Sequence, residues 1–138
     1  MRQAFAMPVA IDAVDPTVVS VKAVAKDHLT DDGLMGLEVA VSEALANIVS
    51  HAVGLPDGRT VGIELVTGPE GVTIVIRDEG RPVPYGLFQG TMDIEAIDVM
   101  AEDGRGLSLI RHFVDRISYC SEGGSNRLTL VFARGGPQ

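Results

Sequence analysis

The sequence predicts an α+β fold, a two-layer sandwich in which a mostly antiparallel mixed sheet carries its helices on one face. Two pairs of β-rich segments, each pair joined by a short turn sequence, indicate two hairpins. Between the N-terminal segment and the first hairpin, apolar residues recur at helical spacing over a long stretch. The chain has 138 residues, 46% of them hydrophobic and 22% charged, which is typical of one folded domain spanning residues 1–138.

The first two elements are expected to be an edge strand and a helix. Residues 3–11 are short and apolar, and Pro8 cannot donate a ladder hydrogen bond, which favours the edge of a sheet. Residues 16–29 are predicted to form a helix that Asp15 caps and that Pro16 begins. The apolar stripe of this helix consists of Val18, Val21, Ala25 and Leu29.

A second, longer helix is expected to follow. The Thr-Asp-Asp sequence at 30–32 can cap its start, and Gly54 and Pro56 end it after about Val53. Most of its circumference is apolar when residues are placed about 100° apart, so we expect it to be buried on several sides. Its two apolar flanks are Leu34, Leu37, Val41, Leu45, Ile48 and Ala52, and Met35, Val39, Ala46, Val49 and Val53.

The two hairpins supply the rest of the predicted sheet. Residues 60–66 and 71–78 are separated by the turn sequence TGPE, and residues 116–121 and 126–133 by EGGS. Between the hairpins, residues 80–103 form a stretch of 24 residues, longer than the about 12–15 residues usual for a structureless loop. We interpret it as a lid or binding loop.

Two further helices are predicted near this lid. The sequence DIEAIDVM at 93–100 is compatible with a short helix inside it. Residues 106–115 are predicted to form another helix, because their apolar residues recur at helical spacing. Those apolar residues are Leu107, Ile110, Phe113 and Val114.

Composition excludes several classes of function and site. Nineteen acidic against eleven basic side chains give a net charge of −8, so nucleic acid is not an expected partner. The single cysteine, Cys120, excludes an intrachain disulfide and a cysteine-based zinc site, and we interpret it as a core residue near a strand end. No signal peptide and no apolar run of about 18–20 residues is evident, which predicts a cytoplasmic protein without a membrane partner.

One narrow arc of the long helix is polar. Glu43, Asn47 and His51 follow one another at positions i, i+4 and i+8, hence on one face. The arc is explained either as the solvated side of the helix or as a binding face. In the second case a carboxylate and a carboxamide one turn apart could hold a magnesium-bound anion, and the carboxylate could accept a proton. The whole arc consists of Gly36, Ala40, Glu43, Asn47, Ser50 and His51.

Two glycine segments suggest a ligand with a flat ring and phosphates. Asp78 ends a predicted strand, where its carboxylate could accept a hydrogen bond from an exocyclic amine, and Gly80 would let the backbone approach a ring. Gly104 and Gly106 open a predicted helix, whose free N–H groups favour phosphate, and Arg105 adds a positive charge. Each segment alone is typical of an ordinary turn.

Together and in this order, the three motifs resemble a known family. EALANIVSHA looks like the N-box, RDEGRP like the first glycine box and GRGLSLIRHFVD like the second glycine box of the ATP-binding domain shared by histidine kinases, gyrase and heat-shock chaperones. Within that GHKL family, with its Bergerat fold, the chain is most similar to the small serine-protein kinases that act as anti-sigma factors. The resemblance covers nearly the whole chain.

The resemblance implies ATP and magnesium as cofactors and gives roles to individual residues. Asn47 would bind magnesium, and Glu43 would be the general base for the attacking hydroxyl. Asp78 would read the adenine amino group, and Gly80 would border the adenine. His51 stands where the motif has a histidine, but packing at the helix end explains it equally well. The turn that would hold the phosphates beneath the lid is Gly104, Arg105, Gly106 and Leu107.

The function implied is an ATP-dependent serine/threonine-protein kinase that acts as an anti-sigma factor. Its expected partners are a sigma factor, a STAS-domain antagonist that it phosphorylates, and a second copy in a homodimer. The chain departs from the family at Pro82, where the fuller first glycine box has a second glycine, so the start of the lid should be stiffer. An alternative is therefore a non-catalytic module that binds nucleotide or sequesters its partner. A metabolic enzyme using the same pocket would need a second catalytic constellation, which the sequence lacks.

Overall fold

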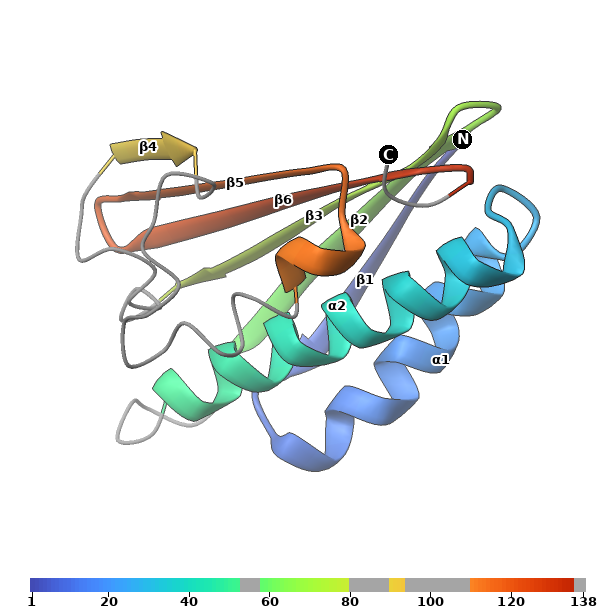
Figure 1. The fold of residues 1–138 in the computed structure, drawn as a ribbon. Helices are drawn as coiled ribbons and strands as arrows, with labels where there is room; N and C mark the ends of the chain where they lie inside the picture. Colours follow the sequence, from blue (N-terminus) through green and yellow to red (C-terminus); the bar gives the residue numbers. More distant parts are fainter. Residues whose placement is uncertain (53–57, 80–89, 94–109, 136–138) are drawn as a thin grey trace.

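A six-stranded sheet forms the centre of the protein. The computed structural model describes residues 1–52, 58–79, 90–93 and 110–135. The strand order is β1-β2-β3-β6-β5-β4, and every described pairing is antiparallel. The strands are β1 (Arg2–Pro8), β2 (Thr60–Gly68), β3 (Gly71–Glu79), β4 (Gly90–Asp93), β5 (Arg116–Glu122) and β6 (Ser125–Ala133). Figure 1 shows both long helices on one face of this sheet, which confirms the predicted α+β architecture.

Side chains alternate between the two faces of the sheet. In β3, Val72, Ile74 and Ile76 are buried beneath the helices, and the residues between them are more exposed. β2 and β6 follow the same two-residue period, so the core lies between the sheet and the helical layer. The interpretation of Cys120 as a core residue is wrong, because its neighbours Ile117, Tyr119 and Ser121 face the core and Cys120 faces the other side.

The long helix α2 (Asp31–His51) begins as predicted. Thr30 is the N-cap, and its Oγ1 accepts a hydrogen bond from the backbone N–H of Gly33 at 3.2 Å. Asp31 and Asp32 place negative charge next to the positive end of the helix dipole. The length and apolar composition of α2 would suffice to cross a membrane, but the fold uses its apolar side chains for the core, since Leu37, Val41 and Leu45 are fully buried.

The predicted burial of α2 on several sides is only partly right. The helix contacts the sheet and α1 along one stripe, and of the second predicted flank Val49 still packs against the core. Met35 on that flank is 57% exposed, and Val39 and Ala46 are half-buried. The buried stripe consists of Gly33, Gly36, Leu37, Ala40, Val41, Ala44, Leu45 and Ile48.

The first helix, α1 (Val14–Ala25), differs from its predicted bounds. A 3-10 turn, Ile11–Ala13, precedes it, and its N-cap is Ala13, without a side-chain hydrogen bond. Asp15 therefore lies within the first turn, where its charge still favours the helix dipole, and Pro16 fits because first-turn N–H groups lack helical partners. The predicted apolar stripe is confirmed, since Val18, Val21, Ala25 and Leu29 are all buried.

Several shorter elements complete the fold. The EGGS turn joins β5 to β6 with positive φ angles of +60° at Gly123 and +82° at Gly124, which glycine adopts without strain. Residues 90–93, within the predicted lid, form β4 and pair with β5. Residues 110–113 are helical, as predicted for that part of 106–115. The other lid residues, and the DIEAIDVM segment beyond Asp93, lie outside the described residues.

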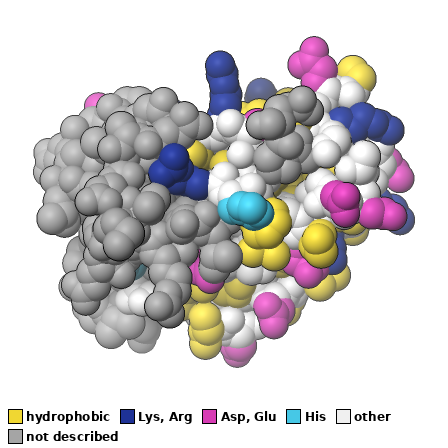
Figure 2. Space-filling model, viewed as in Figure 1, with side chains coloured by type: hydrophobic (Ala, Val, Ile, Leu, Met, Phe, Trp, Pro, Cys, Tyr) yellow, Lys and Arg dark blue, Asp and Glu magenta, His cyan; other side chains and the backbone are white. Residues whose placement is uncertain are grey.

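The helical side of the protein exposes some large apolar side chains. Val19 on α1 is 66% exposed, and Met35 on α2 is 57% exposed. Figure 2 shows apolar side chains lying among acidic ones on this side.

Candidate functional site

Asp78 lies at the carboxyl end of β3, on the helix-facing side of the sheet. It continues the alternation of the buried residues Ile74 and Ile76, so its side chain belongs to the same face. In register on β6 its partner is Asn126, whose Nδ2 donates to Asp78 Oδ2 at 3.2 Å. Ser121 on β5 donates its hydroxyl to Asn126 Oδ1 at 2.7 Å. Three neighbouring strands thus fix the orientation of the Asp78 carboxylate.

Asp78 has a perturbed pKa. Burial raises the pKa of this carboxyl above 3.8, and the hydrogen bond from Asn126 and the positive charge of Arg59 both act in the opposite direction. The carboxylate is therefore partly desolvated yet supported as a hydrogen-bond acceptor. A partly desolvated acceptor beside a hollow is typical of a ligand site.

Replacing Asp78 with asparagine is expected to change how stability depends on pH. Because the pKa of Asp78 is higher in the folded state, its stabilising contribution is complete below the unfolded pKa and is lost as pH rises through the folded pKa. The stability of Asp78→Asn relative to the wild type should therefore increase from about pH 3.5 to about pH 7. Urea unfolding across this range measures the difference, and a pH-independent difference would contradict the raised pKa.

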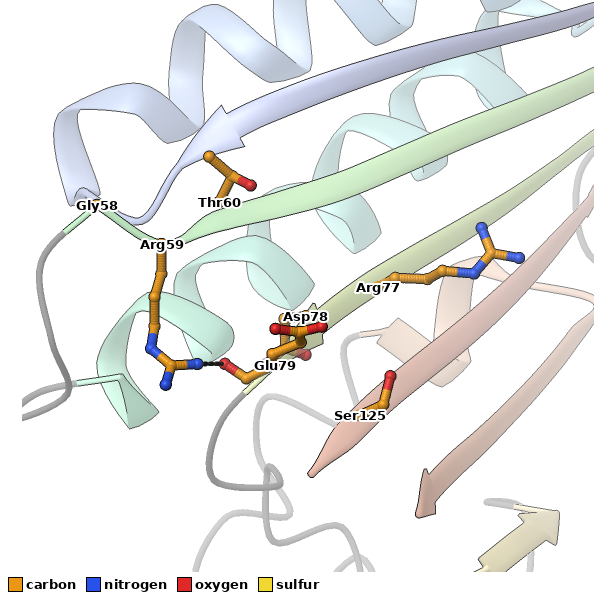
Figure 3. A pocket seen from close by; sticks show the side chains of 7 residues that line it. All are labelled: Gly58, Arg59, Thr60, Arg77, Asp78, Glu79 and Ser125. Atoms are coloured by element: carbon orange, nitrogen blue, oxygen red, sulfur yellow. Dashed lines mark hydrogen bonds between the residues drawn. The ribbon is translucent and has the colours of Figure 1, made fainter. Parts of the chain in front are cut away.

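A hollow of about 610 Å³ opens beside Asp78, at the ends of β2, β3 and β6. Figure 3 shows Arg59 and Arg77 on opposite sides of Asp78, with Arg59 Nη1 donating to the backbone oxygen of Glu79. A hollow of this size can hold a small-molecule ligand. The described lining residues are Gly58, Arg59, Thr60, Arg77, Asp78, Glu79 and Ser125.

Of this lining, the sequence singled out Asp78 alone. Arg59 precedes β2 outside any motif, and Ser125 is the last residue of the EGGS turn sequence, which predicted only a hairpin. Both residues reach the hollow because the ends of separate strands meet there. The predicted pairing of the strands could have identified both residues, because it places the ends of β2 and β6 beside Asp78 at the end of β3.

The predicted polar arc of α2 includes half-buried polar residues and buried small residues. Glu43, Asn47 and His51 are half-buried, one on each successive turn. Gly36 was assigned to the polar arc, but it is buried, and a Cβ there would lie 3.1 Å from the Phe113 ring. The absence of a side chain at Gly36 lets the 110–113 helix pack on α2, so this residue does not belong to a polar face.

These observations also orient the polar arc. Glu43 is seven residues after Gly36, so it lies on nearly the same face of α2, toward the 110–113 helix. The carboxyl ends of α2 and β3 lie at the same end of the protein (Figure 1). Among the described residues, however, the lining of the hollow includes neither Glu43 nor Asn47. Their convergence with Asp78 on one ligand stays a prediction.

The glycine positions of the predicted site lie outside the described residues. These are Gly80, Pro82 and the turn Gly104, Arg105, Gly106 and Leu107. In the sequence, the turn directly precedes the helix that packs on Gly36 of α2. The contact of this turn with phosphate stays a prediction.

The described residues contain no cluster of three or more His, Cys, Asp or Glu side chains that could hold a metal. Magnesium at nucleotide sites is bound by one or two side-chain oxygens together with phosphate oxygens and water. Glu43 and Asn47 offer one carboxylate and one carboxamide oxygen donor, both partly exposed. The donor set of α2 therefore fits magnesium that arrives with a nucleotide.

Comparison with known proteins agrees with the motifs. The serine-protein kinase RsbW of Halalkalibacterium halodurans is 28% identical over 99 residues, and that of Staphylococcus aureus 34% over 104. The serine/threonine-protein kinase BtrW of Bordetella bronchiseptica is 32% identical over 95 residues. Each alignment covers 69% of this chain, and it spans 60%, 63% and 67% of these three relatives, respectively. The model of the histidine kinase-like ATPase domain matches residues 7–132, and the chain therefore belongs to that family.

Proposed function

We propose that this protein is an ATP-dependent serine/threonine-protein kinase that acts as an anti-sigma factor in the cytoplasm. It phosphorylates a STAS-domain antagonist and sequesters a sigma factor. The observation that carries the proposal is the oriented acceptor Asp78 beside a hollow. The names of the RsbW and BtrW relatives support the kinase class. The two partners follow from the resemblance of the three motifs to anti-sigma factor kinases.

In this proposal the nucleotide base lies against the end of β3. The Asp78 carboxylate accepts a hydrogen bond from the adenine amino group, and Gly80 borders the ring. Residues 104–107 hold the phosphates with backbone N–H groups and with the Arg105 charge. His51, at the end of α2, contributes to the same nucleotide-binding face.

The α2 side chains act on the transferred group. Asn47 holds magnesium, which when bound neutralises charge on the phosphate oxygens. Glu43 orients the serine or threonine hydroxyl of the partner and accepts its proton. That oxygen then forms a bond to the terminal phosphorus of ATP, and the bond from that phosphorus to the departing ADP oxygen breaks.

Contacts with proteins belong to the same proposal. Val19 and Met35 are exposed apolar side chains on the two helices. They support association with a second copy or with a protein partner. Light scattering of the purified protein measures the proposed homodimer directly.

The kinase function is tested by incubation with magnesium and ATP labelled at the terminal phosphate, together with candidate STAS-domain proteins. We expect label on a serine or threonine of the partner. A module that only sequesters its partner would bind that protein and leave it unlabelled. Labelling and partner binding are therefore measured on the same samples.

Replacing Asn47 with alanine is expected to remove magnesium-dependent nucleotide binding. The variant should bind ATP at least about tenfold more weakly in magnesium, because a carboxamide oxygen is lost from the metal. Calorimetric titration with ATP, in magnesium and in a chelator, measures this. The control is Ser50→Ala on the exposed part of the same arc. Retention of full magnesium-dependent affinity by Asn47→Ala would remove this residue from the metal site.

A further inference from the structure

Two buried polar residues lie behind Asp78. Asn126 is 1% exposed and Ser121 is 6% exposed, and both are on the helix-facing side of the sheet. Their neighbours on this face, such as Leu128 and Tyr119, are buried core residues. Burying a carboxamide and a hydroxyl is costly unless they are hydrogen-bonded. The series Ser121–Asn126–Asp78 provides such bonds and ends at the one member that borders the hollow.

The direction of the hydrogen bonds matters for Asp78. Ser121 donates to Asn126 Oδ1, which turns the Asn126 amide nitrogen toward Asp78. That nitrogen donates to Asp78 Oδ2, so Asp78 accepts at this oxygen. An ionised carboxylate can only accept hydrogen bonds, whereas a protonated one can also donate. The arrangement therefore favours the ionised form against the effect of burial, and Arg59 adds to it.

A carboxylate held in this state distinguishes between ligands. An amino group on a heterocyclic ring donates to it. A ring carbonyl at the same position would instead face it with a second acceptor, and both groups would lose a partner. Each 1.4 kcal/mol of such mismatch is about tenfold in affinity.

We propose that Asn126 and Ser121 are positioning residues that keep Asp78 a hydrogen-bond acceptor and so select a purine nucleotide with an amino group at C6 over one with a carbonyl there. Neither residue touches the nucleotide, because both are buried behind Asp78. The inference rests on the proposed nucleotide site. It adds an explanation of how the site selects the nucleotide base.

The experiment compares ATP with inosine triphosphate, which has a carbonyl in place of the C6 amino group. Calorimetric titrations with magnesium are made on the wild type, Asn126→Asp and Ser121→Ala. The control is Ser118→Ala, on the same strand but on the opposite face of the sheet. The wild type and the control should prefer ATP by about tenfold or more.

Asn126→Asp keeps the shape of the side chain and replaces its donor. Two facing carboxylates repel each other, which raises the pKa of the pair, and Asp78 loses the donor that holds it as an acceptor. The preference for ATP should then fall to about threefold or less. Ser121→Ala removes the hydroxyl that orients the amide, and its preference should lie between those two values. Circular dichroism and thermal unfolding establish that each variant is folded.

The outcomes separate the inference from the proposed function. A wild type that binds neither nucleotide overturns the proposed function and the inference with it. A wild type that prefers ATP, with folded variants that keep the full preference, overturns the inference alone. If a variant binds both nucleotides more weakly but the ratio of the two affinities is unchanged, the residue has a merely structural role. That result also overturns the inference. If Asn126→Asp does not fold, the ratio measured for Ser121→Ala decides.

Discussion

Replacing Glu43 with alanine is expected to abolish phosphoryl transfer and to leave ATP bound. General-base catalysis contributes about 10²- to 10⁴-fold to a rate, and the Glu43 carboxylate is the proposed base. The side chain is half-buried on α2, so its removal should cost the fold little. The initial rate of label transfer to the partner measures catalysis, and calorimetric titration measures ATP binding.

The matched control for this variant is Glu38→Ala. Glu38 lies on the same helix and forms an ion pair with Lys22 of α1, away from the proposed chemistry. A partly exposed ion pair contributes little to stability, so transfer by Glu38→Ala should stay near the wild-type rate. Equal transfer by the wild type and Glu43→Ala would remove Glu43 from catalysis. Loss of ATP binding in Glu43→Ala would instead identify a binding role.

The largest effect on stability is expected for Gly71→Ala at the start of β3. Gly71 has a φ of +140°, and a Cβ there would lie 2.0 Å from the backbone oxygen of Phe132 on β6. Backbone cannot yield as a flexible side chain can, so the central β3–β6 pairing would have to separate locally. We expect a loss of at least about 3 kcal/mol in the free energy of unfolding. Urea denaturation measures this loss.

Gly68→Ala is the control at the other end of the same turn. Gly68 is paired in register with Gly71, but a Cβ there would meet nothing within 4 Å, and its φ is not positive. Its substitution should change the free energy of unfolding by less than about 1 kcal/mol. If both variants lost equal stability, the steric explanation for Gly71 would be wrong.

Local sequence patterns predicted most of the fold. The β-rich segments and their turn sequences gave the β2–β3 and β5–β6 hairpins, and Thr30 gave the start of α2. The prediction of Asp15 as the N-cap was wrong. The preference of aspartate for N-cap positions is a local signal, whereas the 3-10 turn at Ile11–Ala13 sets where α1 begins. The four residues of β4 are too few to show a period.

The site was less accessible from sequence, because its support comes from distant residues. Asp78 stood out through its motif, but Asn126 lies 48 residues further on and reaches it only through strand register. Gly36 was assigned to the polar arc, but it is buried against Phe113, and this partner could not be inferred from spacing along α2. The roles of Glu43 and Asn47 stay predictions, as do those of His51, Gly80 and residues 104–107.

β6 joins the two halves of the sheet, since it pairs with β3 on one side and with β5 on the other. It is also the last strand of the chain that the structure describes. All six strands must therefore leave the ribosome before the central pairing of β3 with β6 can form. Until then the edge of β3 is unpaired, and an unpaired strand edge is a site where nascent chains can associate.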